Sequence, residues 1–223
     1  MNKEFIFFSK KVYKCNKCAR LVNFRNKITL KKRKSYLDQV YWGKPISGFG
    51  DLNGNIIIIG LAPAAHGATR TGRVFTGDKS ADFLFNCLFK SGLSNQPNSD
   101  HINDGLKLKN TFITLALRCV PPEDKPTKEE LKNCSAFFKE ELNMIKNKKV
   151  IVALGKIAFD ACIKFYKENY GLTGSYKFGH GSKYDINGLT IFGCYHPSPR
   201  NVNTKRINTT KMTYLFKRAK KLI

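Results

Sequence analysis

Acidic residues are scarce in this sequence. Its 223 residues include 16 Asp and Glu against 40 Lys and Arg, a formal net charge of +24. Residues 1–47 carry 13 cations and only Glu4 and Asp38, and residues 200–223 carry eight cations and no acid. Solubility does not require such an excess, so the imbalance favours a polyanionic partner such as nucleic acid. A coding bias toward Lys is the alternative explanation.

Long apolar runs are also missing. The run that begins at Ile56 is interrupted by Gly60 and Pro63, and residues 5–8 are too few for a signal peptide. We therefore expect no membrane partner and a cytoplasmic protein of a prokaryote, or a nuclear one in a eukaryote. Internal repeats, a Walker-type phosphate loop and a nucleophile elbow are absent too, which disfavours a phosphate or acyl enzyme. The 42% apolar and 25% charged residues exclude a disordered chain.

Four apolar segments predict buried parallel strands: residues 55–60, 111–117, 150–155 and 190–195. Helical patterns lie between and after them, at 81–89, 127–145, 156–166 and 212–222, and Thr127 with Glu130 forms a capping box. This alternation predicts a three-layer α/β/α fold with a central, mainly parallel four-stranded sheet, whose site lies at the carboxyl ends of the strands. Residues 1–223 are expected to form one domain. Residues 1–50 do not fit the alternation and indicate a basic, metal-bound appendage.

Four of the seven cysteines favour a metal site. Cys15 and Cys18 have a C-x-x-C spacing in a polar stretch, where a buried-thiol role is unusual. Cys119 ends the second predicted strand, and Cys134 lies one turn inside the following helix. Zinc and a [4Fe-4S] cluster both take four thiolates, so the spacing alone leaves both open. The remaining three lie at apolar positions and are expected in the core: Cys87, Cys162 and Cys194.

Two segments after strands carry candidate site residues. Residues 60–67 read GLAPAAHG, small residues that let a ligand approach the backbone, and Phe75 follows as a flat stacking surface. His196 directly ends the last predicted strand and begins the segment HPSPRN. An isolated Phe belongs more commonly to the core and a lone His is more commonly structural, but both lie at the expected edge of the sheet.

Together these segments resemble the uracil-DNA glycosylase superfamily, and most closely its family 5, the iron–sulfur enzymes. The resemblance covers nearly the whole chain. It rests on residues 41–45 (YWGKP), 48–51 (GFGD), 60–67 (GLAPAAHG), 118–122 (RCVPP) with 125–127 (KPT), 178–181 (FGHG), and 195–198 (YHPS) with Asn201. Any one of these motifs alone is weak, and their joint occurrence is specific.

The resemblance implies a monofunctional glycosylase that flips uracil out of DNA and hydrolyses its N-glycosidic bond, leaving an abasic site for base excision repair. It implies a structural [4Fe-4S] cluster, with zinc as the alternative, held by Cys15, Cys18, Cys119 and Cys134. His196, Asp78 and Asn201 take the catalytic roles. The base pocket comprises Gly60, Leu61, Ala62, Ala64, Ala65, His66, Phe75, Leu115 and His180. DNA contacts fall to Ser198, Arg200 and Arg206. A monomer is expected.

Three positions qualify this expectation. Leu61 stands where family 4 has an acidic residue, so the first motif supplies no side-chain base. Asp78 is the nearest carboxylate, but a helix N-cap is an equally good role for it; we hypothesise that the leaving group does most of the catalysis and that water is loosely positioned. Leu115 replaces an Asn that would read uracil, which predicts a broader range including hypoxanthine and oxidised or alkylated pyrimidines. The alternative function is a non-catalytic DNA-binding module with a zinc-clamped basic segment.

Overall fold

A central sheet of six strands organises the chain, in the order β1-β3-β2-β4-β6-β5. The computed structural model describes residues 2–186 and 188–223. The strands are β1 (Phe49–Gly50), β2 (Ile56–Gly60), β3 (Thr111–Leu115), β4 (Val150–Leu154), β5 (Lys183–Ile186) and β6 (Leu189–Cys194). The four inner strands are parallel and coincide with the four predicted ones, whereas β1 and β5 pair antiparallel at the two edges.

The predicted four-stranded sheet was therefore too small. β1 has only two residues and β5 alternates exposed and half-buried positions before ending in a buried one, so neither carries the continuous apolar run that marks a buried strand. β1 forms because a long-range partner is available, with Phe49 opposite Ile113 of β3. β5 pairs instead with the next strand in the chain, in a hairpin that places Tyr184 opposite Ile191 of β6.

The inner strands are buried on both faces, as their uninterrupted apolar sequence requires. In β2, Ile56 and Ile58 belong to one core cluster, while Ile57 and Ile59 belong to the other. This division follows from the two-residue period of a strand, which turns successive side chains to opposite faces.

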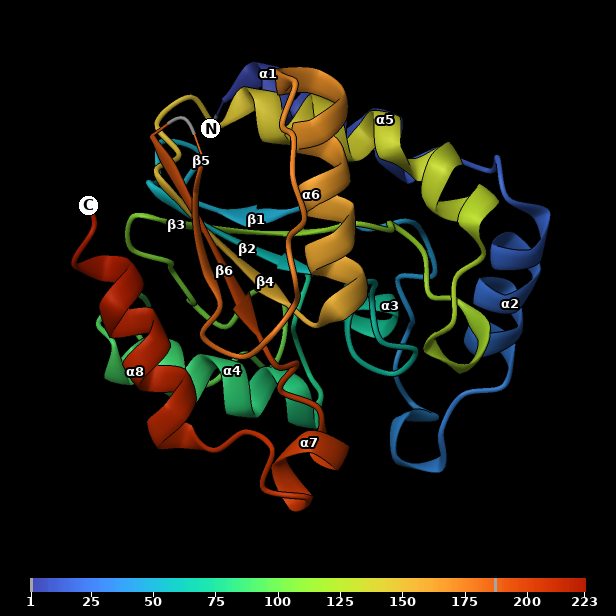
Figure 1. The fold of residues 1–223 in the computed structure, drawn as a ribbon. Helices are drawn as coiled ribbons and strands as arrows, with labels where there is room; N and C mark the ends of the chain where they lie inside the picture. Colours follow the sequence, from blue (N-terminus) through green and yellow to red (C-terminus); the bar gives the residue numbers. More distant parts are fainter. Residues whose placement is uncertain (1, 187) are drawn as a thin grey trace.

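Helices cover each face and complete the predicted three layers (Figure 1). One face carries α4 (Lys79–Lys90) and α8 (Thr209–Lys220), and the other carries α5 (Lys128–Met144) and α6 (Lys156–Tyr170). The expected capping box is present at Thr127 and Glu130. Within the described ranges no helix combines the length and apolar character of a bilayer span.

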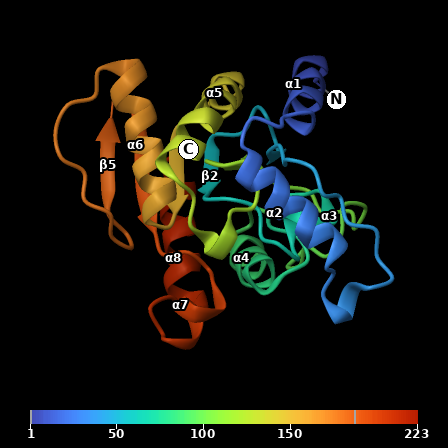
Figure 2. The same cartoon turned by 90° about the vertical axis from the view of Figure 1, so that its right-hand side faces the viewer.

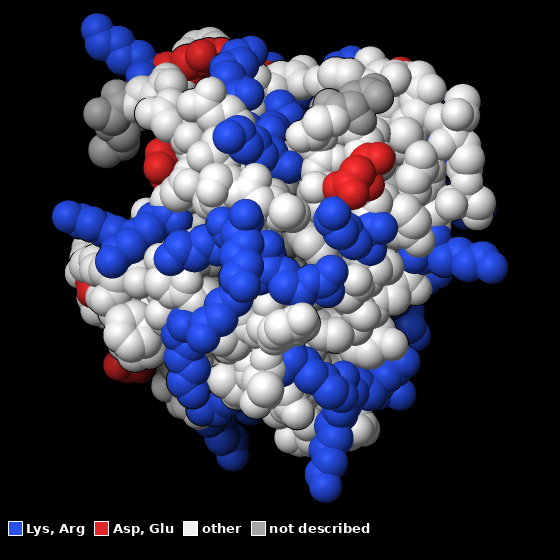
Figure 3. Space-filling model, turned by 60° about the vertical axis from the view of Figure 1, so that its left-hand side comes forward, with Lys and Arg blue, Asp and Glu red and all other residues white. Residues whose placement is uncertain are grey.

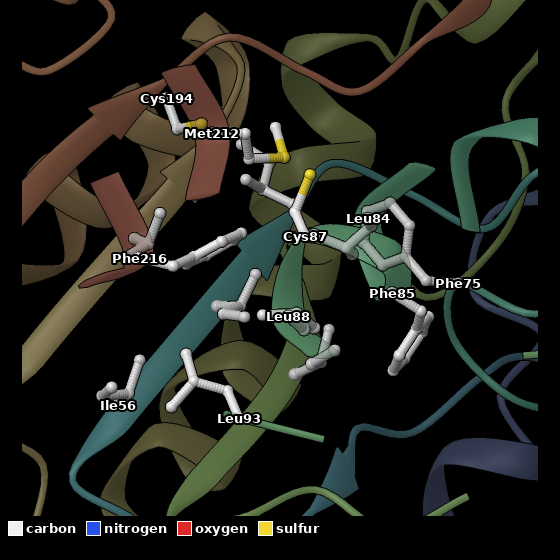
Figure 4. Packing of buried hydrophobic residues seen from close by; sticks show 14 of the residues in the cluster. Ile56, Phe75, Leu84, Phe85, Cys87, Leu88, Leu93, Cys194, Met212 and Phe216 are labelled. Atoms are coloured by element: carbon white, nitrogen blue, oxygen red, sulfur yellow. The ribbon is translucent and has the colours of Figure 1, made fainter. Parts of the chain in front are cut away.

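The core thiols behave as expected. Figure 4 shows Cys87 of α4 pointing toward Met212 of α8, with Cys194 of β6 nearby. Cys162 lies in the cluster on the opposite face of the sheet. Burial raises the pKa of Cys87 to about 11 and raises the pKa of Cys162 and Cys194 as well, so these thiols are protonated core side chains.

The N-terminal segment forms two helices, α1 (Lys3–Tyr13) and α2 (Ala19–Leu30), that pack beside the sheet (Figure 2). Phe8 and Val12 of α1 share a third core cluster with Phe137 of α5. Lys11 is paired with Glu140 at 2.8 Å, and Nε and Nη2 of Arg20 each donate to a Glu130 carboxylate oxygen at 2.7 Å. Short helices complete the fold: η1 (Lys34–Tyr36), α3 (Ala68–Thr71), η2 (Pro122–Asp124) and α7 (Pro199–Asn203).

Candidate active site and cysteine site

A large pocket opens at the carboxyl ends of the parallel strands, where ligands bind in open α/β sheets. Its volume is about 2050 Å³, including the open mouth. The segments after β2, β4 and β6 line it, together with Leu115 at the end of β3. We call this the strand-end pocket.

Phe75 forms one wall of the strand-end pocket. Its backbone has a φ of +47°, which is uncommon for a non-glycine residue, and its ring packs on the backbone of Gly60. A Cβ atom at position 60 would lie 2.8 Å from Phe75 Cε2 and 2.9 Å from Leu115 Cδ2. Gly60 is therefore required for this close approach, although it lies beneath the pocket surface.

His196 lies opposite Phe75, with ring centroids 5.9 Å apart and an angle of 33° between the planes. The residue keeps some exposed surface at the pocket wall, but burial of its imidazole lowers the pKa to about 4. The ring is therefore neutral at pH 7 and can donate one N–H to a ligand.

The loop after His196 is held by its own polar side chains. Asn201 donates from Nδ2 to the His196 carbonyl oxygen at 2.9 Å, and Ser198 Oγ accepts from the Asn201 amide at 3.3 Å as the N-cap of α7. Both contacts hold the backbone that presents the imidazole.

Asp78 is the N-cap of α4 and also lines the strand-end pocket. Its Oδ1 accepts from the amides of Ser80 and Ala81 at 2.9 and 3.0 Å. A Cβ atom on Gly67 would lie 1.8 Å from Asp78 Oδ2, so the carboxylate depends on glycine at position 67. Burial raises the pKa of Asp78, and the two amide hydrogen bonds oppose that shift.

Most of the predicted site residues line the strand-end pocket. These residues are Leu61, Ala62, Ala64, Phe75, Asp78, Leu115, His196, Ser198, Arg200, Asn201 and Arg206.

Four predicted base-pocket residues are placed elsewhere. Gly60 lies under Phe75, and Ala65 is not on the pocket surface. His66 lines a neighbouring cleft and is hydrogen-bonded to the Tyr41 hydroxyl at 2.9 Å. His180 Nδ1 accepts a hydrogen bond from the Tyr195 amide at 3.4 Å, and its imidazole packs against the Tyr195 ring.

Several pocket residues were not singled out from the sequence: Ser80, Lys156 and Ile157. Phe178 and Tyr195 also line the pocket; they belong to motifs that carried the resemblance but had no role assigned to them. Gly155 and Lys156 bring the N-terminus of α6 to the pocket, where its helix dipole favours an anion. The sequence signal that could have indicated this is the apolar strand β4, which is followed by a glycine and then by the helical pattern of α6. Tyr195 packs against the ring of Phe178, and Arg206 lies over Tyr195 at 5.2 Å.

The four cysteines singled out from the sequence line one small void of about 350 Å³ between α2, β3 and α5. We call this the cysteine site. None of the four is in a disulfide. Burial raises the pKa of Cys18, raises that of Cys119 to about 11, and raises that of Cys134 to about 12. Within residues 2–186 and 188–223, no group of three or more His, Cys, Asp or Glu is arranged to hold a metal ion.

The surroundings of the cysteine site fit a negatively charged group bound through sulfur. Arg25 is 5% exposed and donates to Cys119 Sγ at 3.1 Å, while its Nε has no partner among the described residues. The Arg118 amide donates to Cys134 Sγ at 3.2 Å, and Asn133 contacts Cys18 Sγ at 3.8 Å. A buried guanidinium requires a compensating charge, which metal-bound thiolates would supply.

Known proteins similar to this chain share nearly its whole length. The family model of the "Uracil DNA glycosylase superfamily" matches residues 47–220. The chain belongs to the uracil-DNA glycosylase superfamily. It is 42% identical to the type-5 uracil-DNA glycosylase of Pyrobaculum aerophilum, over 95% of this chain and 90% of the relative. The type-5 enzyme of Thermus thermophilus is 40% identical, over 93% of each chain.

These relatives confirm the resemblance to family 5 that the motifs indicated. A type-4 uracil-DNA glycosylase of Thermotoga maritima is more distant, at 26% identity over 85% of this chain. The superfamily consists of hydrolases that act on N-glycosyl bonds, and this chain is one of them. The segment with Cys15 and Cys18 lies outside the matched residues 47–220 but inside the span shared with the type-5 relatives.

Proposed function

We propose that this glycosylase removes uracil from DNA by hydrolysing the bond between the base and C1′ of the sugar. The supporting observation is the neutral His196 beside Phe75 on the wall of the strand-end pocket. The excess of cations supplies a general attraction for the DNA backbone. Figure 3 shows Lys and Arg far outnumbering Asp and Glu on the side of the molecule that carries α8.

The base enters the pocket by flipping out of the stack, because the glycosidic bond is inaccessible within a duplex. Phe75 offers an aromatic face that replaces part of the lost stacking, and its fixed backbone on Gly60 keeps that face in place. Backbone groups of residues 61–64 line the pocket on the β2 side and lie beside the base.

His196 stabilises the leaving base. As the C1′–N1 bond breaks, the electron pair moves onto the base and negative charge grows on O2 of uracil. The N–H of the neutral imidazole donates to that oxygen, and the donor is worth most in a site that excludes water. The sugar becomes a cation stabilised partly by DNA phosphates, and a water molecule then adds to C1′ and releases a proton.

Asp78 positions that water and accepts its proton. Of the two carboxylates on the pocket wall, Asp78 is half-buried and Asp124 is exposed. One Asp78 oxygen caps α4 and the second is available. A raised pKa improves a carboxylate as a general base. The position of Asp78 therefore supports a stronger role than the loose placement of water expected from the sequence.

The flanking DNA backbone contacts the rim of the pocket. Ser198 accepts from Asn201, which leaves its hydroxyl hydrogen for a phosphate oxygen. Arg200 is exposed at the mouth, and Arg206 is oriented by the ring of Tyr195. The N-terminus of α6 at Lys156 adds a further favourable field for phosphate.

The range of bases includes uracil and extends to hypoxanthine and damaged pyrimidines. Leu115 lines the pocket where an amide would read N3 and O4 of uracil. A leucine forms neither hydrogen bond, so a base that lacks those groups is not rejected by unpaired polar atoms.

The cysteine site holds a [4Fe-4S] cluster through Cys15, Cys18, Cys119 and Cys134, in preference to zinc. The cluster supplies a structural crosslink and no redox step. The four cysteines that line one site and the unpartnered Arg25 Nε support an anionic group there. Such binding would release the protons held by thiols with raised pKa.

The test is release of free uracil from oligonucleotides, with alkaline cleavage of the abasic product as readout. We expect excision by the unaltered protein and a loss of about 100- to 1000-fold in His196→Ala with unchanged melting temperature. His101→Ala, which alters an exposed histidine in the loop before β3, is the matched control and retains full activity. Binding of DNA without uracil release would instead support a non-catalytic module.

A further inference from the structure

A second structural feature beside the strand-end pocket has no role in the chemistry above. Residues 31–40 form a loop between α2 and the segment that leads to β1, which we call the 31–40 loop. It carries four consecutive cations, Lys31, Lys32, Arg33 and Lys34, and one acid, Asp38. Two large apolar side chains near them face solvent: Leu37 is 64% exposed and Val40 is 92% exposed.

The 31–40 loop is fastened directly to the turn that carries the active-site residues. The guanidinium of Arg70 lies 3.9 Å from the centre of the Tyr36 ring, and its Nη1 donates to Gln39 Oε1 at 2.6 Å. The same group donates to the carbonyl oxygens of His66 at 2.8 Å and Gly77 at 2.7 Å. One side chain thus joins the loop to the residue preceding Asp78.

The loop also borders a cleft next to the strand-end pocket. This second cleft, of about 770 Å³, is lined by Arg33 and Tyr36 of the loop and by His66 and Arg70. Asp78 lines both clefts and so forms the wall between them. Figures 1 and 2 both show the 31–40 loop and α7 projecting at the same end of the molecule.

The chemistry of the loop identifies what covers it. Exposed Leu and Val side chains require an apolar surface, and the adjacent cations require negative charge at short range. Duplex DNA offers both within a few ångströms, since phosphates border grooves that expose sugars and base edges, and apolar side chains contact unstacked steps in other DNA-binding proteins.

We propose that the 31–40 loop is a second DNA-contacting element, in which residues 31–34 bind phosphates while Leu37 and Val40 contact bases beside the flipped nucleotide. The proposal rests on the proposed function. The loop and α7 would contact the duplex on the two sides of the pocket mouth, and Arg70 would couple the loop to the Asp78 turn.

The first test measures binding alone and does not depend on catalysis. The four cations of the loop are changed to Gln, and the affinity for undamaged duplex DNA is measured as a function of salt. Each lost phosphate contact lowers the salt slope by about 0.9, so we expect a reduction of about 2 to 4. The control changes four exposed cations at the opposite end to Gln: Lys3 and Lys10 of α1, Lys139 of α5, and Lys146 in the turn after α5. Equal slopes in the two variants would overturn the proposal.

The second test addresses the apolar side chains. A variant with Leu37→Ser and Val40→Ser is compared on uracil in duplex and in single-stranded DNA. We expect about tenfold slower excision from duplex and unchanged excision from single strands, because only the duplex must be opened. The control Phe7→Ser removes another exposed apolar side chain, 72% exposed on α1. A loop variant that acts like this control on duplex DNA would indicate a protein partner and refute the proposal.

These outcomes separate the loop from the proposed function. If the unaltered protein releases no uracil from either substrate, the proposed function fails. The salt dependence of binding to undamaged duplex still reports whether the loop contacts DNA.

Discussion

The strand-end pocket and the cysteine site are built by different means. In the pocket, Leu61 directly follows β2 and His196 lies two residues after the end of β6. The short loops near them are fixed by local contacts, such as Asn201 with His196 and Asp78 with the first turn of α4. The cysteine site joins residues more than 100 positions apart in the chain. Its contacts include Arg25 with Cys119 and, nearby, Arg20 with Glu130.

This difference implies that the strand-end pocket governs the reaction and that the cysteine site governs the stability of the fold. The strand-end pocket rests on the continuously hydrogen-bonded sheet. The cysteine site instead fastens α1 and α2 to β3 and α5 through one small cluster of apolar residues. Substitutions in the pocket should therefore change turnover with little effect on unfolding, and substitutions at the cysteine site should do the reverse.

The largest effect is expected at the cysteine site. Changing Cys15 and Cys18 to Ala should abolish absorption near ~400 nm and lower the melting temperature by about 10 °C, or about 3 kcal/mol for a chain of this size. Thermal unfolding followed by circular dichroism measures the shift. Cys162→Ala, at a core thiol, is the control and should retain the colour. A colourless unaltered protein, together with a cysteine variant that melts at the same temperature as the unaltered protein, would contradict the cluster.

The second-largest effect is expected from Asp78→Asn. Asparagine also caps helices, so α4 should remain intact, while loss of the base should reduce kcat by about 100-fold. Single-turnover excision of uracil measures this change, and the melting temperature checks the fold. A reduction of less than about threefold would show that water needs no carboxylate and that Asp78 serves only as a cap.

The pH dependence of the free energy of unfolding should reveal the lowered pKa of His196. Its pKa is about 4 in the folded protein and about 6.5 when unfolded. Between these values the unfolded chain binds more protons, so this contribution is fully present above pH 6.5 and is lost as the pH falls toward 4. The loss is at most about 1.4 kcal/mol per pH unit. Urea unfolding from pH 7 to 4.5 should show a smaller decline in His196→Gln, and identical declines would contradict the buried neutral imidazole.

The smallest effect is expected from Leu115→Asn. The new amide could hydrogen-bond uracil, so selectivity for uracil over hypoxanthine should rise by about tenfold, equivalent to about 1.4 kcal/mol. The ratio of kcat/KM values on the two substrates measures it. Strict selectivity for uracil in the unaltered protein would contradict the broad base range.

Local sequence patterns were sufficient for much of the fold. The continuous apolar runs in β2, β3, β4 and β6 predicted buried parallel strands, because burial on both faces leaves no polar positions. Thr127 with Glu130 predicted the start of α5 through contacts that span one helical turn. The motifs around His196 likewise predicted a site at the strand ends, since those residues directly follow a strand.

Sequence alone determined the inner strands, the main helices, the excess of positive charge and the position of His196 and Phe75 at one edge of the sheet. Tertiary structure alone decided that His66 and His180 lie outside the pocket, that Arg25 lies against Cys119, and that β1 and β5 extend the sheet. The physical reason is how far apart in the chain the interacting residues lie. Apolar periodicity and caps record interactions within a few residues, whereas side-chain direction in a loop and the pairing of β1 with β3 depend on partners from distant parts of the chain. β5 pairs with its chain neighbour β6, but its mixed burial leaves no apolar run from which the sequence could predict it.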